Sequence, residues 1–163
     1  MINYLATQKN WQNAFSDTIT SFAELAQALD LPIDSFDSQV GQFPLKVPRR
    51  FVQKMAKGDI HDPLLKQVLP TFLETVQVTG FVTDPLDEQH ANPVKGIIHK
   101  YASRVLIPVT GACVVNCRYC FRQHFDYHEN LPTQNDWQAI SAYITAHPAV
   151  NEVILSGGDP LSL

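Results

Sequence analysis

Apolar residues repeat with helical spacing in the first part of the chain. Residues 22–29 (FAELAQAL) carry one apolar face, which predicts a helix, and Ser21 with Glu24 predicts a capping box at its start. Two further short helices are predicted over residues 49–57 and 64–69, each opened by a proline and the second capped by an aspartate. The pattern therefore indicates a series of short helices.

Continuous apolar runs replace the helical spacing in the last part of the chain. RVLIPV (residues 104–109) and EVIL (residues 152–155) are typical of buried strands. Between them, residues 135–147 return to helical spacing after Thr133, which can cap a helix. Strand, helix and strand form a βαβ unit, so we expect a parallel sheet with a right-handed crossover. Residues 76–98 carry scattered glycines and prolines, which predicts irregular structure.

These elements predict an α/β fold in two parts. Residues 1–100 form an N-terminal helical extension, and residues 101–163 form the start of a second domain built on the βαβ unit. Two parallel strands alone do not make a stable sheet, because their side chains lack neighbours on at least one edge. We therefore expect the chain to be a truncated, front half of a larger α/β protein.

Composition narrows the class of protein. Of the 163 residues, 45% are apolar and 17% are charged, which is ordinary for a soluble globular protein. The formal net charge of −4 argues against a protein that mainly neutralises nucleic-acid phosphates or coats an anionic membrane. The first residues lack a basic start followed by an apolar run, and no stretch reaches the ~18 apolar residues of a membrane helix. We therefore expect a cytoplasmic protein with no nucleic-acid or membrane partner.

All three cysteines of the chain lie within eight consecutive positions, directly after the first predicted strand. Their spacing is Cys113-x-x-x-Cys117-x-x-Cys120, and an odd number of thiols disfavours a disulfide framework. In a reducing cytosol, clustered thiols more often bind metal or do redox chemistry. The carboxyl ends of parallel strands are also where α/β proteins place their active sites. Residues 113–120, here called the cysteine loop, are therefore a candidate metal site.

The spacing alone leaves three explanations of the cysteine loop open. A zinc site needs a fourth ligand, for which His99 or His124 is available, although neither stands at a recognised zinc spacing. A [4Fe–4S] cluster held by three thiolates leaves one iron open to a substrate or cofactor. Buried structural thiols are the third explanation, but three of them together by chance is improbable. The cluster is the favoured explanation.

A glycine turn follows the second predicted strand. SGGDP, residues 156–160, places two glycines where a backbone can approach a ligand closely. A lone Gly-Gly pair is more often only a tight turn. Its pairing with the cysteine loop is what favours a binding function.

The segment CVVNCRYC resembles the cluster loop of radical S-adenosylmethionine enzymes, with Tyr119 in the aromatic position of that motif. The resemblance implies a [4Fe–4S] cluster on the three cysteines, with S-adenosyl-L-methionine on its open iron. An electron from the reduced cluster then gives methionine and a 5′-deoxyadenosyl radical. In that family a glycine turn contacts the amino group of S-adenosylmethionine, and the matching residues here are Ser156, Gly157, Gly158 and Asp159.

The resemblance extends well beyond the cysteine loop. DPLLKQVLP, DPLDEQHANPVKGIIHKY and EVILSGGDPL are similar to segments of the lysine 2,3-aminomutase family. WQNAFSDTITSFAELAQAL and FPLKVPRRFVQKMAKGD resemble, more narrowly, the branch that makes (R)-β-lysine for modification of elongation factor P. The family implies an incomplete (β/α) barrel with an N-terminal helical extension. It also implies conversion of α-lysine to β-lysine, with pyridoxal 5′-phosphate as a further cofactor.

Individual residues take expected roles from this resemblance. Arg122 matches the arginine that binds the substrate carboxylate, a role that suits the guanidinium fork. Arg104 matches a residue near the phosphate of pyridoxal phosphate, and Lys100 stands where the family often has a second phosphate-binding arginine. The lysine that bonds to pyridoxal phosphate is expected beyond Leu163, so no catalytic residue is assigned within the chain.

The resemblance also implies partners, and it leaves alternatives. The implied partners are lysine as a small-molecule substrate, an electron donor such as flavodoxin or ferredoxin, and a separate ligase that uses the β-lysine. An aminomutase for glutamate or arginine is the nearest alternative function. A non-catalytic iron–sulfur or zinc-binding module and a truncated product with no activity of its own are the others. The sequence leaves the oligomeric state open.

Overall fold

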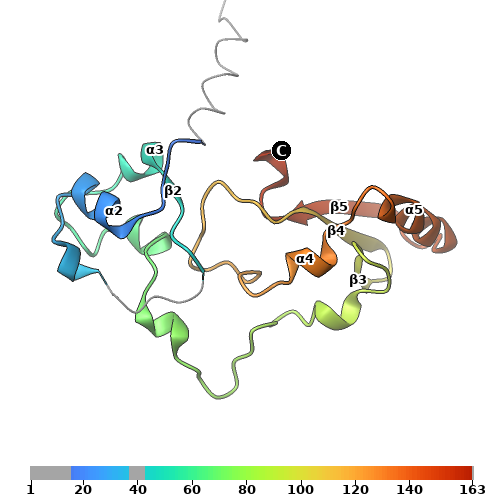
Figure 1. The fold of residues 1–163 in the computed structure, drawn as a ribbon. Helices are drawn as coiled ribbons and strands as arrows, with labels where there is room; N and C mark the ends of the chain where they lie inside the picture. Colours follow the sequence, from blue (N-terminus) through green and yellow to red (C-terminus); the bar gives the residue numbers. More distant parts are fainter. Residues whose placement is uncertain (1–15, 37–42, 163) are drawn as a thin grey trace, which may run out of the picture. The chain divides into compact units, whose positions relative to one another are not determined.

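A computed structural model of the protein describes residues 16–36 and 43–162. The described residues fall into two compact units. The first unit comprises the residues up to Thr79 together with Val114–Cys120, and the second comprises Gly80–Cys113 and the residues from Phe121 onward. Residues 114–120 of the cysteine loop therefore belong to the first unit, although they follow β4 of the second in sequence (Figure 1).

The first unit consists of short helices around one pair of short strands. In chain order its elements are β1 (Thr18–Ile19), α2 (Phe22–Ala28), the 3₁₀ helix η1 (Ile33–Ser35), β2 (Val47–Pro48), α3 (Arg49–Val52), and the 3₁₀ helices η2 (Leu65–Gln67) and η3 (Phe72–Thr75). β1 and β2 pair antiparallel, with Ile19 opposite Val47. The small strand pair was not predicted, since two residues are too few to show an alternating pattern.

The core of the first unit explains why these short elements hold together. Its fully buried side chains come from both strands, from α2 and from the segment around η2: Ile19, Leu25, Leu29, Val47, Leu65 and Val68. Burying a side chain of this size contributes about 1.5–3 kcal/mol relative to leaving it exposed. Val115 of the cysteine loop packs against the same core. The core therefore holds part of the cysteine loop as well as the helices.

Two of the predicted helices differ in detail from those observed. Ser21 is the N-cap of α2, but its side chain makes no capping hydrogen bond, so the predicted capping box is wrong. Glu24 instead forms an ion pair with Arg49. The helix predicted over residues 49–57 ends at Val52. The backbone N–H of Ala56 donates to the Asp62 carboxylate at 3.0 Å, which competes with helical bonding at that position.

Asp62 accepts hydrogen bonds from the segment that follows it, but Leu64 is the N-cap of that element, so the predicted cap at Asp62 is wrong. Its Oδ1 accepts from the N–H groups of Leu64 and Leu65, both at 2.8 Å, although the element formed is the short 3₁₀ helix η2. The hydrogen bond from the Ala56 N–H, followed by those from Leu65 and Leu64, lowers the pKa of the Asp62 carboxyl below its usual value.

Asp62 gives a testable pH dependence. Because the folded pKa lies below the unfolded value of about 3.9, the stabilisation is present above that pH and is lost as the pH falls through the folded pKa. We expect Asp62→Asn to lower the free energy of unfolding at pH 7 and to flatten its decline in acid. Urea unfolding of both proteins between pH 3 and pH 7 measures this. Parallel pH curves for the two proteins would contradict it.

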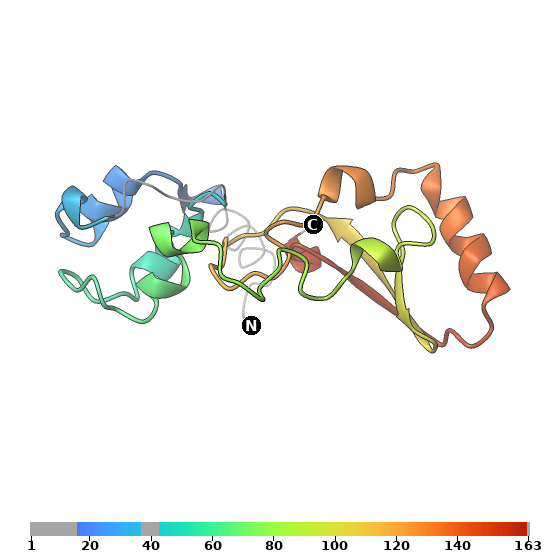
Figure 2. The same ribbon diagram turned by 90° about the horizontal axis from the view of Figure 1, so that it is seen from below.

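The second unit is an α/β arrangement. Its elements are the 3₁₀ helix η4 (Gln89–Ala91), β3 (Ile98–Tyr101), β4 (Arg104–Thr110), α4 (Tyr127–Asn130), α5 (Asp136–Ala146), β5 (Glu152–Gly157) and the 3₁₀ helix η5 (Pro160–Ser162). The sheet order is β3-β4-β5, and α5 runs along one face of it (Figure 2). β4 and β5 are parallel, which confirms the βαβ prediction. The α/β class is therefore confirmed.

The core of the second unit lies between the sheet and α5. Val105 and Ile107 lie on the same face of β4. Both are buried with Ile140 of α5 and with Ile97, which precedes β3. The helix was predicted within one residue at each end, but Asn135 is its N-cap, so the predicted cap at Thr133 is wrong. The Thr133 N–H and hydroxyl instead donate to the Asp136 carboxylate, each at 2.7 Å.

Two features of the sheet differ from the prediction. β3 pairs antiparallel with β4, so β4 is the central strand of a mixed sheet. β5 is an edge strand rather than a buried one, since Val153 and Leu155 are 45% and 56% exposed. An apolar run cannot distinguish the two situations, because it records the chemistry of the side chains and not the neighbours that cover them.

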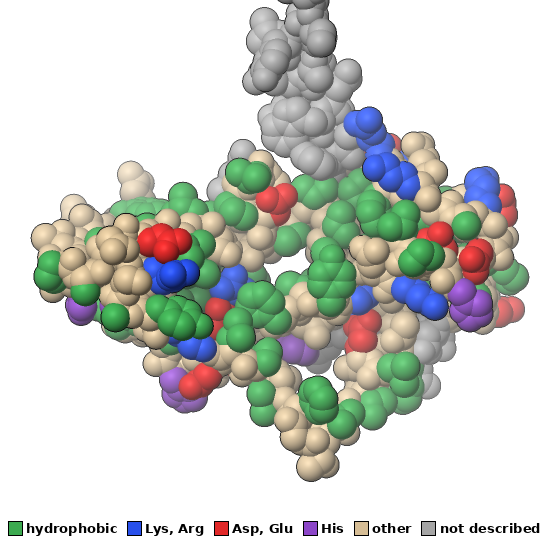
Figure 3. Space-filling model, turned by 180° about the vertical axis from the view of Figure 1, so that it is seen from behind, with side chains coloured by type: hydrophobic (Ala, Val, Ile, Leu, Met, Phe, Trp, Pro, Cys, Tyr) green, Lys and Arg blue, Asp and Glu red, His purple; other side chains and the backbone are tan. Residues whose placement is uncertain are grey.

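Exposed apolar side chains concentrate in residues 72–86, which run through the end of the first unit into the start of the second. They are Phe72, Leu73, Val76, Val78, Phe81, Val82 and Leu86. On the face shown in Figure 3, hydrophobic side chains lie among interspersed acidic and basic ones. Local turns rather than a core hold most of this stretch, in agreement with the irregular structure predicted from residue 76 onward. Among the described residues, no helix is long and apolar enough to cross a membrane.

Candidate functional site

The end of β5 holds the backbone that leads into the cysteine loop. Within the second unit, the Gly158 N–H donates to the Thr110 carbonyl at 2.7 Å, and the Asp159 N–H donates to the Ala112 carbonyl at 2.8 Å. The Thr110 hydroxyl oxygen accepts from the Ala112 N–H at 3.0 Å. Cys113 is the next residue, so its backbone position is fixed by hydrogen bonds that continue the parallel pairing of the two strands.

The glycines of residues 156–160 are required by this close approach. Gly157 has φ +118°, and a Cβ added there would overlap the Thr110 carbonyl oxygen. A Cβ added at Gly158 would overlap the Ala112 carbonyl oxygen and lie 2.6 Å from its carbonyl carbon. The structure therefore accounts for both glycines by contact with the protein's own backbone. A contact of Ser156, Gly157, Gly158 and Asp159 with S-adenosylmethionine stays a prediction.

Cys117 and Cys120 lie on one turn of the first unit, where the Cys120 N–H donates to the Cys117 carbonyl at 3.1 Å. The three cysteine side chains are partly exposed, and none is in a disulfide. Tyr119, between the two, is 72% exposed. Electrostatic interaction with the Cys117 side chain, followed by a hydrogen bond to it, raises the pKa of the Tyr119 phenol. The turn therefore presents two soft sulfur donors at the protein surface.

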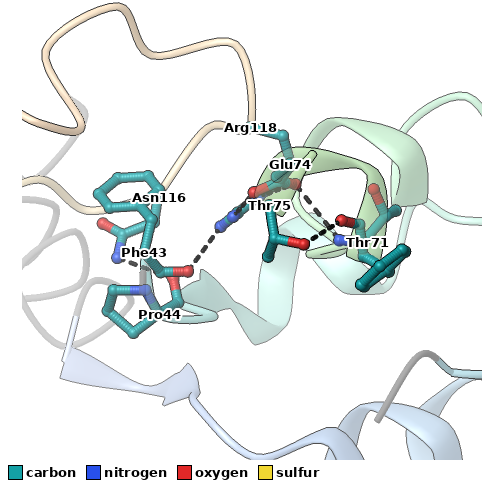
Figure 4. A network of polar contacts seen from close by, with 8 residues as sticks. Phe43, Pro44, Thr71, Glu74, Thr75, Asn116 and Arg118 are labelled. Carbon is teal, nitrogen blue, oxygen red and sulfur yellow. Dashed lines mark hydrogen bonds and ion pairs between the residues drawn. The ribbon is translucent and has the colours of Figure 1, made fainter. Parts of the chain in front are cut away.

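Arg118 anchors the turn of Cys117 and Cys120 to the rest of the first unit (Figure 4). Its guanidinium donates to both carboxylate oxygens of Glu74, from Nε to Oε1 at 2.9 Å and from Nη2 to Oε2. Its Nη1 donates to the Phe43 carbonyl at 3.0 Å, and the ring of Phe43 lies 5.1 Å from the guanidinium carbon. The Arg118 side chain is only 7% exposed. A bidentate pair in such a setting fixes the plane of the guanidinium as well as its position.

The same turn is held by three further hydrogen bonds, two of them from its backbone. The Asn116 N–H donates to the Lys46 carbonyl at 2.9 Å, and its side-chain amide donates to the Pro44 carbonyl at 3.0 Å (Figure 4). The Arg118 N–H donates to the Gln67 carbonyl at 2.8 Å. Cys117 therefore lies between two residues whose backbone and side chains are both tied to the first unit.

Sequence reasoning missed Glu74. Thr71 and Glu74 form a capping box at η3, and that S/T-x-x-E spacing was a readable signal for a local role. The Glu74 carboxylate also binds Arg118, 44 positions away in sequence. No local pattern predicts that second contact.

Arg122 is buried within the second unit. Its Nε donates to Glu88 Oε2 at 2.9 Å, its Nη2 donates to Glu88 Oε1 at 2.6 Å, and its Nη1 donates to the Ser156 hydroxyl oxygen at 3.0 Å. The structure therefore brings together two residues that were assigned to different ligands, Arg122 and Ser156. It adds Glu88, which lies in the segment predicted only as a loop.

Arg104 and Lys100 lie at the other end of the sheet. Arg104 opens β4, six residues before Thr110, which corresponds to about 20 Å along an extended strand. It pairs with Glu152 at 3.4 Å, and Lys100 of β3 donates to the Leu86 carbonyl. The structure groups these two cations near the β3–β4 turn and does not bring them to the end of β4 that leads into the cysteine loop. Their role toward a phosphate stays a prediction.

The histidines considered for zinc have other surroundings. His99 contacts the Tyr143 hydroxyl at 2.7 Å and lies beside the His147 ring, in the layer between β3 and α5. His124 is exposed. Among the described residues, no group of three or more His, Cys, Asp or Glu side chains is arranged to hold a metal ion. The three cysteines do not form such a group either, so their role as ligands of a cluster stays a prediction.

Comparison with known proteins gives a consistent family. No protein-family model matches the chain. The chain is 46% identical over 157 residues to an L-lysine 2,3-aminomutase of Haemophilus influenzae, which covers 94% of the chain and 46% of that protein. It is 45% identical over 159 residues to the L-lysine 2,3-aminomutase of Escherichia coli, covering 95% of the chain and 46% of that protein. The chain is also 30% identical over 161 residues to the L-lysine 2,3-aminomutase of Clostridium subterminale, which covers 96% of the chain and 38% of that protein.

These matches confirm the resemblance drawn from the cysteine loop and its flanking segments. The identities, which extend over almost the whole chain, show that it is related to aminomutases. More narrowly, the chain belongs to the L-lysine 2,3-aminomutase family. It spans about half the length of the curated relatives that it matches.

Proposed function

We propose that the protein is a radical S-adenosylmethionine 2,3-aminomutase that converts α-lysine to β-lysine. The observation that carries the proposal is the identity of 45–46% to L-lysine 2,3-aminomutases over almost the whole chain, cysteine loop included. We further propose that residues 1–100 are the N-terminal extension and that residues 101–163 are the first βαβ unit of a partial (β/α) barrel. The parallel β4–β5 pair, joined through α5, supports this arrangement.

The cysteine loop is the proposed cluster site. Cys113, Cys117 and Cys120 would hold a [4Fe–4S] cluster, and their partial exposure supports access of iron to the thiols. When bound, the reduced cluster would supply the electron that cleaves S-adenosylmethionine, and pyridoxal phosphate would supply the π-system to which the substrate radical adds during the amino migration. The chain's own part is to hold the thiols in place, through the anchors of Arg118 and Asn116 and through the backbone bonds to Thr110 and Ala112.

The remaining assignments follow the family resemblance. Tyr119 and the turn from Ser156 to Asp159 are proposed to contact S-adenosylmethionine, and Arg104 and Lys100 are proposed to bind the phosphate of pyridoxal phosphate. Arg122 is proposed to bind the carboxylate of lysine. Its guanidinium is fixed in plane by Glu88, as binding of a planar carboxylate requires.

We propose that the β-lysine is used for the modification of elongation factor P. The resemblance of residues 11–29 and 43–59 to that branch of the family supports it. The electron would come from a small redox protein such as flavodoxin or ferredoxin. The lower identity to the Clostridium enzyme, 30%, also supports a branch distinct from that enzyme.

Anaerobic reconstitution tests the proposed function. The protein at its natural length is loaded with iron and sulfide, reduced, and examined by electron paramagnetic resonance with and without S-adenosylmethionine. Lysine turnover is then followed by mass spectrometry. We expect a cluster signal that changes when S-adenosylmethionine is added, and formation of β-lysine. A loaded protein that turns over glutamate or arginine but not lysine would contradict the substrate, and a colourless zinc protein would contradict the cofactor.

Arg122→Lys tests the proposed carboxylate contact. A lysine ammonium cannot present two parallel N–H donors, so we expect the Michaelis constant for lysine to rise about 10-fold or more. Iron content should stay unchanged, because Arg122 is not a cluster ligand. Steady-state kinetics and iron analysis on the same preparation give both values. An unchanged Michaelis constant would remove Arg122 from the substrate site.

A further inference from the structure

Arg122 and Glu88 form a buried pair that the family resemblance does not explain. Their side chains are 7% and 6% exposed, and two hydrogen bonds join the Nε–Nη2 edge of the guanidinium to the carboxylate. An ion pair this deep costs desolvation of both groups, so it is weak evidence for a stabilising role. Its geometry is more informative than its energy, because it fixes which edge of the guanidinium faces which partner.

Glu88 is itself held in place by its backbone. The Glu88 N–H donates to Asp84 Oδ1 at 3.1 Å, and the Gln89 N–H donates to Asp84 Oδ2 at 3.0 Å. The hydrogen bond from Gln89, followed by that from Glu88, lowers the pKa of the Asp84 carboxyl, so this support stays ionised at neutral pH. The loop of residues 84–89 is therefore an ordered support for one carboxylate, although the sequence marks it only as irregular.

The other sides of the guanidinium are also enclosed. Ser156 accepts from Nη1 at 3.0 Å, and the rings of Phe121 and Phe125 lie 4.8 Å and 5.9 Å from the guanidinium carbon. With Glu88 on the Nε–Nη2 edge, Nη1 is held in one direction, beside Ser156. Rotation of the guanidinium away from that direction would break both bonds to Glu88.

We propose that Glu88 is the positioning residue for Arg122 and directs its guanidinium toward the carboxylate of the amino-acid substrate. The inference rests on the proposed function, since it assigns a supporting residue to the same site. Glu88 does not touch the substrate. It orients the donor that does, and it does so through the Asp84 loop.

The test compares lysine with 1,5-diaminopentane, which is lysine without its carboxylate. Both are measured on the protein at its natural length, lysine by turnover and diaminopentane by inhibition of that turnover. In Glu88→Gln the charge is lost and only one carbonyl oxygen can accept from the Arg122 edge. Because a hydrogen bond to a charged group is stronger than one to a neutral group, we expect the Michaelis constant for lysine to rise about 10-fold or more. The turnover number and the inhibition constant of diaminopentane should change by less than about 2-fold.

A matched control variant shows whether the effect is specific to the pair of Arg122 and Glu88. Glu24→Gln removes the carboxylate from another Arg–Glu pair of the chain, the one with Arg49, and should leave both constants unchanged. If Glu88→Gln does not fold, Glu88→Asp keeps the charge and shortens the side chain. We expect that variant to weaken lysine selectively as well, but less.

Each outcome decides the inference. Selective loss of lysine affinity supports it. Equal loss for lysine and diaminopentane would show a merely structural role and overturn it, and unchanged or tighter lysine binding would show that Glu88 is no positioning residue or competes with the substrate. Absence of lysine turnover by the unaltered, cluster-loaded protein would instead overturn the proposed function, and the inference with it, before any variant is compared.

Discussion

Replacing Cys117 with alanine is expected to abolish cluster assembly. Two thiolates cannot hold a [4Fe–4S] cubane, and Cys113, Cys117 and Cys120 are the only thiols of the 163 residues, so none in this chain can substitute. After anaerobic reconstitution, we expect the iron content to fall from about four per chain to near zero. Iron and sulfide analysis, with the brown colour and its loss on oxidation, measures the effect.

His124→Ala is the control for that experiment. His124 is exposed and close in sequence to the cysteine loop, and it was one of two histidines available to a zinc site. We expect it to leave iron and sulfide unchanged. A Cys117→Ala protein that keeps full iron and sulfide would defeat the cluster assignment, whereas zinc that is lost in both variants would favour the zinc site.

Replacing Gly158 with alanine is expected to destabilise the second unit and to displace Cys113. The added methyl group would lie 2.6 Å from the carbonyl carbon of Ala112 and overlap its oxygen, and that atom belongs to the backbone rather than to a side chain that can rotate away. Relief requires separation of the end of β5 from residues 110–112, with loss of their hydrogen bonds. We expect a loss of about 3 kcal/mol or more in the free energy of unfolding and a reduced iron content.

Gly58→Ala separates the steric effect from the effect of backbone conformation. Gly58 has φ +72° but open space around its Cα, so the substitution strains the backbone without a collision. We expect a cost of about 1–2 kcal/mol and full iron content. Denaturant unfolding and iron analysis of both variants give the comparison. Equal effects of the two substitutions would contradict the close packing of Gly158 against Ala112.

The sequence predicts the parallel strand pair and α5 well, and the reason is physical. Residues 104–109 and 152–155 are continuous apolar runs, and residues 135–147 carry apolar residues at helical spacing. The spacing of the apolar residues and the length of each segment therefore predict the same elements. Spacing also predicts the candidate cysteine loop, since three thiols in eight positions are visible without any structure.

Long-range contacts are what the sequence cannot show. Ser21 and Glu24 have the spacing of a capping box, yet Glu24 turns to Arg49, 25 positions away. Thr71 and Glu74 do form the box, and Glu74 still reaches Arg118. The exposure of β5 is equally invisible in its residues. The partners of Glu24 and Glu74 come from distant parts of the chain, so no local sequence pattern predicts these contacts.

The anchors of Arg118 also set an order of events during folding. They join the turn of Cys117 and Cys120 to residues 44 and 75 positions earlier in the chain. Contacts that close such long loops form only after the loop entropy is overcome, and later than local helices. In a newly made chain this turn is therefore expected to stay mobile until the core around α2 and η2 has formed. During that interval its thiols would be exposed to oxidation, so iron loading and folding of the first unit would have to keep pace with each other.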